Sequence, residues 1–190
     1  MAFSWLVNFP TDRIFGRIVG YMENSEEARG ESWSMWRPKA AAYARAFGVF
    51  SAEERFEIAD EAIARAYAAR ARFDATRDFS PWFFAIVRRL CLDALKKKRE
   101  LPLLPERLAA EPTRQLSAEG EAMAREEKDF VRRFVLALPR ADRELTSLVY
   151  SQELSISEAA LVLARPEGTI KWRLAMIRKA LRKAWERAYG

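Results

Sequence analysis

The sequence contains no histidine and only one cysteine, Cys91, among its 190 residues. The missing histidines exclude catalytic triads and metal sites that need an imidazole, and a single cysteine can form neither an intrachain disulfide nor a cysteine cluster. No uncharged stretch approaches the roughly 18 to 20 apolar residues of a membrane span, and residues 1–11 lack the features of a secretory leader. We therefore expect a cytoplasmic protein with no metal, cofactor, small-molecule substrate or membrane insertion.

Residues that favour β-strands are scarce. Val, Ile and Thr together supply 21 residues, whereas Ala and Leu supply 50. This bias favours helices, and a hydrophobic fraction of 50% is enough to bury real cores. The composition predicts an all-α protein.

Charge is distributed unevenly along the chain. The net charge is +4 over residues 1–99, −4 over residues 100–127 and +6 over residues 128–190. The two basic blocks indicate an anionic partner such as nucleic acid, although two ordinary helical bundles with slightly basic surfaces would show the same charge.

The acidic segment contains three prolines, Pro102, Pro105 and Pro112. These prolines prevent a long helix across the first half of the segment. We predict two small helical domains, 1–99 and 126–190, joined by a flexible linker over 100–125 that forms one or two helical turns near its end.

The C-terminal block predicts a helix-turn-helix. Helices are expected over 128–138, 141–152 and 156–163, and Ser155 with Glu158 fits a capping box at the start of the third. After a short break, Pro166 suits the first turn of a long helix with a continuous apolar stripe. That stripe consists of Ile170, Leu174, Ile177, Leu181 and Trp185. In such a unit the second helix enters the major groove of DNA.

The exposed side of this second helix carries the candidate base-reading and phosphate-binding residues. They are Glu167, Gly168, Thr169, Lys171, Trp172, Arg173, Arg178 and Lys179. Arg173 can bond guanine bidentately, and Thr169 can touch a thymine methyl group or a phosphate. The alternative is an ordinary surface helix with solvated charges, which is the simpler explanation for any single lysine.

The N-terminal block predicts one or two helices over 15–50, with a break near 24–25 and the clearest helical stretch over 39–47, and a further helix over 52–72, capped by Ser51. Phe56, Ile63 and Tyr67 mark the expected packing side of this further helix, which Ile58 and Ala62 widen. Its polar side can be a docking face for a protein or a set of solvated charges, and the pattern alone favours the latter. That side carries Glu57, Asp60, Glu61 and Arg65.

A loop over 73–79 leads to another helix with the expected N-cap Ser80 and with Pro81 in its first turn. Because the stretch 82–95 is apolar on nearly every side, it predicts a central core helix, which ends in a basic tail. Aromatic and cationic side chains beside the loop suit single-stranded nucleic acid, where bases stack on rings. Trp82 fits either this role or the core, and Phe83 fits the core better.

These residues carry a resemblance to a known family. The stretch ARARFDATRDFSPWFFAIVRRLCLDALKKKR resembles a promoter-melting helix and the loop before it, and LPRADRELTSLVYSQELSISEAALVLARPEGTIKWRLAMIRKALRKA resembles a C-terminal helix-turn-helix. The two elements that these stretches resemble are typical of bacterial RNA polymerase sigma factors of the sigma-70 family, in the extracytoplasmic function (ECF) group. The similarity covers about residues 15–185, and residues 1–10 have no clear counterpart.

The resemblance implies a dissociable sigma factor that binds core RNA polymerase, through its largest and second-largest subunits, and promoter DNA as duplex and as melted strand. Residues 57–67 match the helix that docks on the largest subunit, which makes the polar side of that helix a contact surface. The minus-10 candidates are Phe73, Asp74, Arg77, Phe79, Trp82, Arg88, Arg89, Lys96 and Lys97. The C-terminal recognition helix would read the minus-35 element, the acidic linker would thread toward the RNA exit path, and an anti-sigma factor would restrain activity.

Four residues depart from the family pattern. Asp60 replaces a usual Gln, Arg89 a common Asn, Ala164 a frequent turn glycine and Trp172 a frequent small polar residue. These departures affect polymerase docking, strand contact and base preference.

Two other classes of protein remain as alternatives. A stand-alone helix-turn-helix repressor or activator, with an N-terminal sensing or dimerisation domain, would bind duplex operator DNA without polymerase. An enzyme acting on nucleic acid is disfavoured, because the chain has neither histidine nor a clustered acidic triad. The expected function therefore involves no covalent chemistry.

Overall fold

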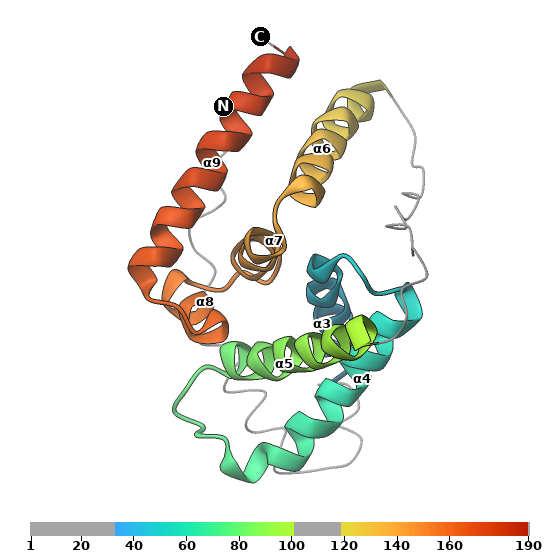
Figure 1. The fold of residues 1–190 in the computed structure, drawn as a ribbon, viewed down its shortest axis with the longest axis vertical. Coiled ribbons are helices and arrows are strands. Elements are labelled where there is room, and N and C mark those ends of the chain that lie inside the picture. Colours follow the sequence, from blue (N-terminus) through green and yellow to red (C-terminus); the bar gives the residue numbers. More distant parts are fainter. Residues whose placement is uncertain (1–32, 101–118, 190) are drawn as a thin grey trace.

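The computed structural model describes residues 33–100 and 119–189, and within these ranges every regular element is helical. This confirms the all-α prediction. The N-terminal helices are α3 (Trp36–Ala44), η1 (Arg45–Phe47), α4 (Ala52–Ala69), η2 (Arg70–Arg72) and α5 (Phe79–Glu100) (Figure 1). The C-terminal helices are α6 (Glu119–Ala137), α7 (Arg140–Thr146), the π-helical turn η3 (Ser147–Ser151), α8 (Ile156–Leu163) and α9 (Glu167–Tyr189). Within residues 33–100 and 119–189, no helix is both long and apolar enough to cross a bilayer.

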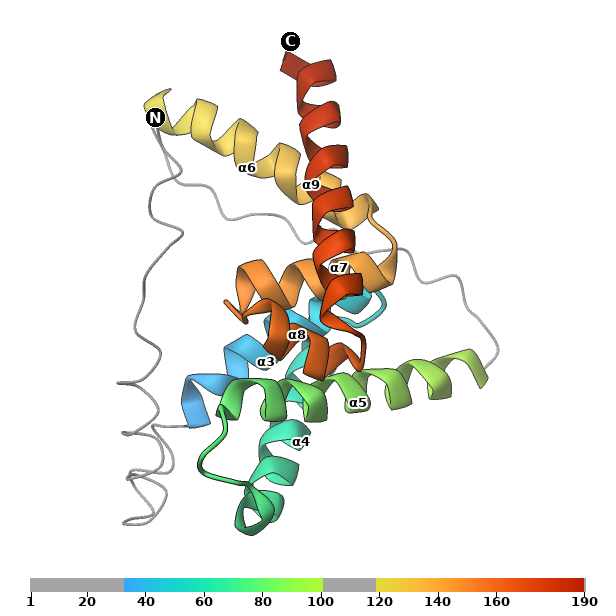
Figure 2. The same cartoon turned by 90° about the vertical axis from the view of Figure 1, so that its left-hand side faces the viewer.

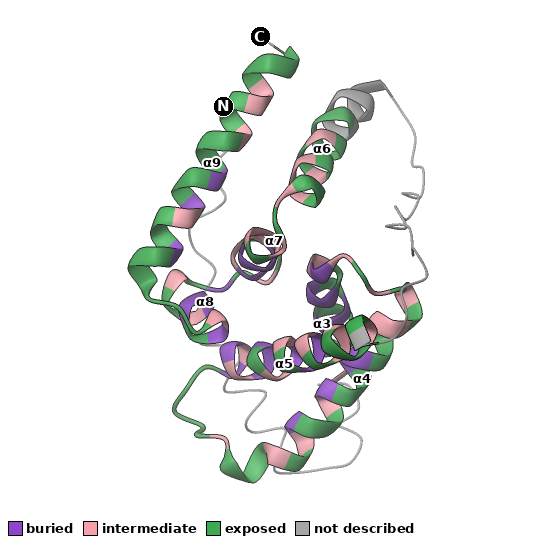
Figure 3. Ribbon diagram, viewed as in Figure 1, coloured by how far each residue is buried: buried purple, intermediate pink, exposed green. Residues whose placement is uncertain are grey.

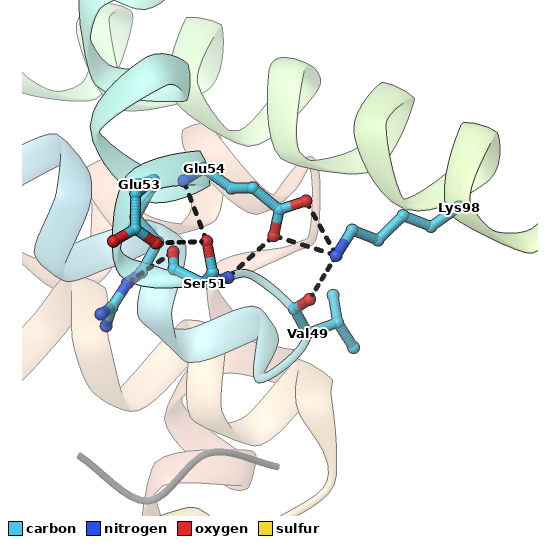
Figure 4. A network of polar contacts seen from close by, with 6 residues as sticks. Val49, Ser51, Glu53, Glu54 and Lys98 are labelled. Carbon is cyan, nitrogen blue, oxygen red and sulfur yellow. Dashed lines mark hydrogen bonds and ion pairs between the residues drawn. The ribbon is translucent and has the colours of Figure 1, made fainter. Parts of the chain in front are cut away.

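A capping box starts α4, as the Ser51 position predicted. The backbone amide of Glu54 donates to Ser51 Oγ at 3.3 Å, and the amide of Ser51 donates to Glu54 Oε2 at 2.8 Å (Figure 4). The same carboxylate receives Lys98 Nζ at 2.9 Å, and Lys98 Nζ also donates to the carbonyl of Val49. The cap therefore ties the start of α4 to the end of α5.

The buried side of α4 differs from the predicted one. Ile58 and Ala62 are buried as expected, but Phe56 is exposed and Tyr67 is only half-buried. Small residues lie inward instead, and these are Ala59, Ala62 and Ala66. Because alanine lets two helices approach closely, α4 packs tightly against its neighbours and keeps its rings at the edge.

Helix α5 is the core helix of the N-terminal half. It buries Phe83, Phe84, Val87 and Cys91 completely or almost completely (Figure 3). It begins at Phe79, so the predicted N-cap Ser80 lies inside its first turn. Pro81 falls in that first turn as well, where an amide hydrogen has no intrahelical partner to lose.

The helix-turn-helix forms as predicted. Glu158 N donates to Ser155 Oγ at 3.2 Å, and Ser155 N donates to Glu158 Oε2 at 2.7 Å, which closes the expected capping box of α8. Ala164 ends α8 in the left-handed conformation, with φ of 51°. This explains why glycine is frequent at that position, since a Cβ strains the left-handed region. Helix α9 begins directly after Pro166, one residue later than expected.

Helical turns occupy the end of the expected linker, as predicted. Helix α6 begins at Glu119, inside the range 100–125, and α5 extends to Glu100. The prolines of the linker and the first ten residues lie outside the described residues.

The two halves pack against each other. Helix α8 lies beside α5, α7 lies beside η1, and η3 contacts α3 (Figures 1 and 2). Buried residues of both halves join one hydrophobic cluster, which includes Phe84 and Val87 from α5 and Leu145 and Leu148 from the C-terminal helices. The chain is thus folded into a closed arrangement of two helical units.

Replacing Ser155 with alanine should lower the free energy of unfolding by about 1 kcal/mol, because the first turn of α8 loses its side-chain cap. Urea denaturation followed by circular dichroism measures this change. Ser155→Asp is the matched control, since aspartate also caps helices and should retain most of the stability. An unchanged urea midpoint for Ser155→Ala would show that the cap contributes nothing.

Candidate nucleic-acid interface

The polar side of α4 is exposed, as the sequence predicted. Glu57, Asp60, Glu61 and Arg65 all face solvent. Arg65 Nε pairs with Glu61 Oε1 at 2.7 Å, one helical turn away. The surface is therefore accessible to a partner and carries an excess of negative charge.

Asp60 is held from α3 by a neighbouring guanidinium. Arg37 donates from Nε to Asp60 Oδ1 at 2.6 Å and from Nη2 to Oδ2 at 2.9 Å, and its guanidinium lies 4.5 Å from the centroid of the Phe56 ring. The hydrogen bonds from Arg37 lower the pKa of Asp60 below its usual value. The exposed Phe56 ring therefore supports the arginine that orients Asp60, which gives this ring a role that periodicity did not reveal.

A side-chain-stabilised turn shapes the loop between α4 and α5. Asp74 Oδ1 accepts hydrogen bonds from the Thr76 amide at 3.0 Å and from Thr76 Oγ1 at 2.7 Å. These bonds lower the pKa of Asp74, so the carboxylate stays ionised and keeps its hold on the turn. Arg77 follows with its side chain 81% exposed and Nε 3.3 Å from Asp74 Oδ2. Asp74 thus shapes the loop, and Arg77 extends from it.

The aromatic cluster beside the loop has a buried and an accessible part. Phe79 is only 2% exposed and stacks on Phe83 at a centroid distance of 5.6 Å. Phe73 and Trp82 are half-buried and lie 4.9 Å apart, and both rings also contact Phe79. In this conformation the Phe79 ring is not exposed to a base, so its contact with DNA stays a prediction.

The cationic residues of α5 are in three different situations. Arg89, Lys96 and Lys97 are exposed, as expected for phosphate contacts. Lys98 is paired with Glu54. Arg88 is partly buried, and its Nε donates to Glu144 Oε2 of α7 at 3.0 Å, so it is not available to DNA in the closed arrangement.

The first turns of α9 present the predicted recognition residues to solvent. All of the positions Glu167, Gly168, Thr169, Lys171 and Trp172 are exposed. Trp172 is 63% exposed, which is unusual for so large an apolar side chain. A Cβ added at Gly168 would meet nothing within 4 Å, so the helix start is open to a close approach. Beneath this surface, Ile170 and Leu174 anchor α9 in the core.

Three further α9 residues of the predicted set differ in their surroundings. Arg173 Nη1 lies 3.3 Å from Asp142 Oδ1 of α7, and Arg178 Nε donates to the hydroxyl of Tyr150 at 2.9 Å. Lys179 is exposed. The Asp142 contact orients Arg173 from behind while leaving its side chain 42% exposed.

Two charged residues of α7, Arg143 and Glu144, escaped the sequence analysis. Glu144 is buried between arginines, and Arg143 donates to carbonyls of both halves of the molecule. Local spacing does not reveal their contacts with the N-terminal half, since Arg88 and Ala46 lie 56 and 97 positions away in the chain. In the described ranges, no group of three or more acidic or cysteine side chains could hold a metal ion.

Comparison with known families gives a match over the N-terminal helices. The family described as Sigma-70 region 2 matches residues 33–100, which contain α3, α4 and α5. The matched range includes both the polar side of α4 and the loop with its aromatic cluster.

Two curated relatives extend the similarity beyond that range. The ECF RNA polymerase sigma factor SigW of Bacillus subtilis is 33% identical over 139 residues, a stretch that is 68% of this chain and 74% of the relative. The ECF RNA polymerase sigma factor SigC of Mycobacterium tuberculosis is 30% identical over 125 residues, or 66% of each chain.

Two solved structures share the fold of both halves. CnrH, in complex with the cytosolic domain of CnrY, has a TM-score of 0.62 and 21% identity, with 93% of this chain and 98% of that chain covered. The sigma factor RpoE of Bartonella quintana, in complex with the anti-sigma factor NepR, has a TM-score of 0.65 and 20% identity, with 83% and 96% covered.

Proposed function

The chain belongs to the ECF group of the sigma-70 family of RNA polymerase sigma factors, and from this membership we propose that it binds core RNA polymerase and directs promoter recognition and DNA melting. The observation that best supports the proposal is the pairing of two surfaces in one chain. One is the exposed start of α9, and the other is the aromatic and basic edge of α5. The stand-alone repressor or activator is not favoured, because it does not account for the match over residues 33–100.

The polar side of α4 is the proposed polymerase contact. Glu57, Asp60, Glu61 and Arg65 are accessible, and the bidentate hydrogen bond from Arg37 fixes the direction of Asp60. A charged helix face of this kind suits a partner with complementary charge. Because the Asp60 side chain is already oriented in the free protein, less side-chain entropy is lost on binding.

The loop and α5 form the proposed minus-10 surface. Trp82 and Phe73 provide partly accessible rings on which unpaired bases can stack, and stacking on an aromatic ring is typically worth about 1 to 3 kcal/mol per base. Arg77, Arg89, Lys96 and Lys97 provide exposed cations for phosphates. Phe79 supports both rings from beneath, and Asp74 holds the turn that presents Arg77.

Helix α9 is the proposed minus-35 reader. Its anchored stripe places Thr169, Lys171 and Trp172 outward, where the second helix of such a unit meets base edges. Arg173 approaches from the side, oriented by Asp142, and Arg178 and Lys179 lie further along the same helix. The two DNA surfaces together would bind two separate promoter elements.

We further propose that the protein performs no covalent chemistry, acts in the cytoplasm and is restrained by an anti-sigma factor. The fold is shared with a sigma factor solved together with the anti-sigma factor NepR.

Purified protein mixed with core RNA polymerase should give transcripts from a subset of a promoter panel. The expected result is open-complex formation and run-off product only when protein and polymerase are both present. Tight binding to duplex DNA by the protein alone, with no transcript from any promoter, would instead identify a repressor or activator.

Replacing Trp82 with alanine should slow promoter opening more than it weakens the initial closed complex, because a stacking surface for unpaired bases is lost. Permanganate reactivity of thymines measures opening, and gel shift measures the closed complex. Trp82→Phe is the control, since phenylalanine keeps a ring against Phe73 and Phe79. A large drop in the melting temperature of Trp82→Ala would assign the side chain to the core instead.

Replacing Arg173 with alanine should weaken binding by about 1 to 3 kcal/mol at one base pair of the minus-35 element and relax specificity there. Competition binding on single-base-pair variants of the promoter measures this effect. Arg182→Ala is the matched control on the same helix, because Arg182 is exposed and lies away from the first turns. An equal loss on every sequence would show that Arg173 contacts only phosphate.

A further inference from the structure

The closed arrangement contains a buried carboxylate at the contact between its two halves. Glu144 of α7 is only 2% exposed. Arg88 of α5 donates to its Oε2 at 3.0 Å, and Arg140 Nε lies 3.1 Å from its Oε1. A buried charge is costly unless it is paired. The stability of the closed form therefore depends on Arg88 lying next to Glu144.

The surroundings of this carboxylate come mostly from the N-terminal half. Tyr43 of α3 is buried nearby, and burial together with the charge of Glu144 raises the pKa of its hydroxyl well above the usual value. Burial and the same charge raise the pKa of the Cys91 thiol to about 12. Glu144 is therefore buried beside side chains of the other half, where Arg88 is the neutralising group that this half supplies, in addition to Arg140 of α7 itself.

A second residue of α7 joins the halves through backbone carbonyls. Arg143 donates from Nε to the carbonyl of Ala46 at 2.8 Å and from Nη2 to that of Phe47 at 3.2 Å, both in η1. Its Nη1 donates to the carbonyl of Leu138, just past the end of α6, at 2.7 Å. One guanidinium thus satisfies carbonyls at the ends of two helical segments in different halves.

The closed arrangement conflicts with simultaneous binding of two promoter elements. Sites about 25 base pairs apart on B-form DNA are separated by about 85 Å, at 3.4 Å per base pair. In the closed form α8 lies directly against α5, so the two DNA surfaces belong to one compact body (Figure 2). The 18 residues between the described ranges can span at most about 60 Å, which permits the halves to separate.

We propose that α7 is an interdomain latch, in which Glu144 holds Arg88 and keeps the free chain closed until binding to polymerase and promoter separates the halves. The part of this inference that concerns DNA rests on the proposed function. The latch itself is a property of the free protein and is testable without polymerase.

The latch has a quantitative consequence for binding. If only the open form binds polymerase, the apparent affinity is reduced by the fraction of molecules that are open. A substitution that opens the chain therefore raises the apparent affinity, up to the limit at which every molecule is open. While the open form is still the minor one, the fold-increase in apparent affinity equals the fold-increase in the open fraction.

Interdomain distance in the full chain tests the latch directly. Fluorescent dyes are attached at Arg99→Cys and Glu186→Cys, two exposed positions in different halves, while the buried Cys91 remains unlabelled. Glu144→Gln and Arg88→Gln should each lower energy transfer and shift the closed-to-open equilibrium by about tenfold or more, because the ion pair is lost. The double variant should open no further than the more open single variant, because both remove the same pair.

Arg89→Gln is the matched control. Arg89 is the next residue on α5, carries the same charge and is exposed, so the distance between the halves should not change. Circular dichroism checks that each variant is folded. If Arg88→Gln fails to fold because it leaves the buried carboxylate of Glu144 with Arg140 alone, Glu144→Gln decides the test, because it removes the buried charge and leaves Arg88, whose side chain is 26% exposed, in contact with water.

Binding to core polymerase separates the two proposals. Glu144→Gln should bind core polymerase more tightly by a factor no larger than the shift measured by energy transfer. Unchanged energy transfer in both single variants would overturn the latch, even if the protein still binds polymerase. Opening without any polymerase binding would support the latch and overturn the proposed function.

Discussion

The arrangement of the two helical halves depends on the burial of one carboxylate. Glu144 is inserted between Arg88 and Arg140 with almost no exposure to solvent. Apolar contacts such as those of Leu145 and Leu148 tolerate small shifts, but a buried ion pair does not, because a misplaced charge loses its partner and its solvent together. The pair therefore fixes the register of α7 against α5, and apolar burial supplies most of the stabilisation.

The starts of α4 and α8 were predictable because they depend on neighbours in the sequence. The capping boxes of Ser51 and Ser155 involve residues three positions apart, and the stripe of α9 repeats every three or four residues. The buried side of α4 was predicted less well, because large rings suggested a packing face. Close packing of helices favours small residues, so Ala59 and Ala66 lie inward, and Phe56 remains at the edge.

The candidate site was predictable where exposure follows from periodicity. The outward positions of α9, such as Trp172, required only the inward stripe to be known. The burial of Phe79 was not predictable, because the start of α5 places its ring in a cluster with Phe83 and Trp36, which no local pattern indicates. The contact between Arg88 and Glu144 joins residues 56 positions apart, and it follows only from tertiary packing.

Arg88 is both a minus-10 candidate of the sequence and the partner of Glu144, so closure and strand capture would compete for the same guanidinium. A guanidinium can bind a carboxylate or a phosphate in the same bidentate manner, but one partner excludes the other. On DNA, a phosphate would replace Glu144 as the partner of Arg88, and Glu144 would regain water instead of staying buried. Glu144 would therefore be solvated and Arg88 paired in the open state, and contacts with polymerase and promoter would shift the equilibrium toward it.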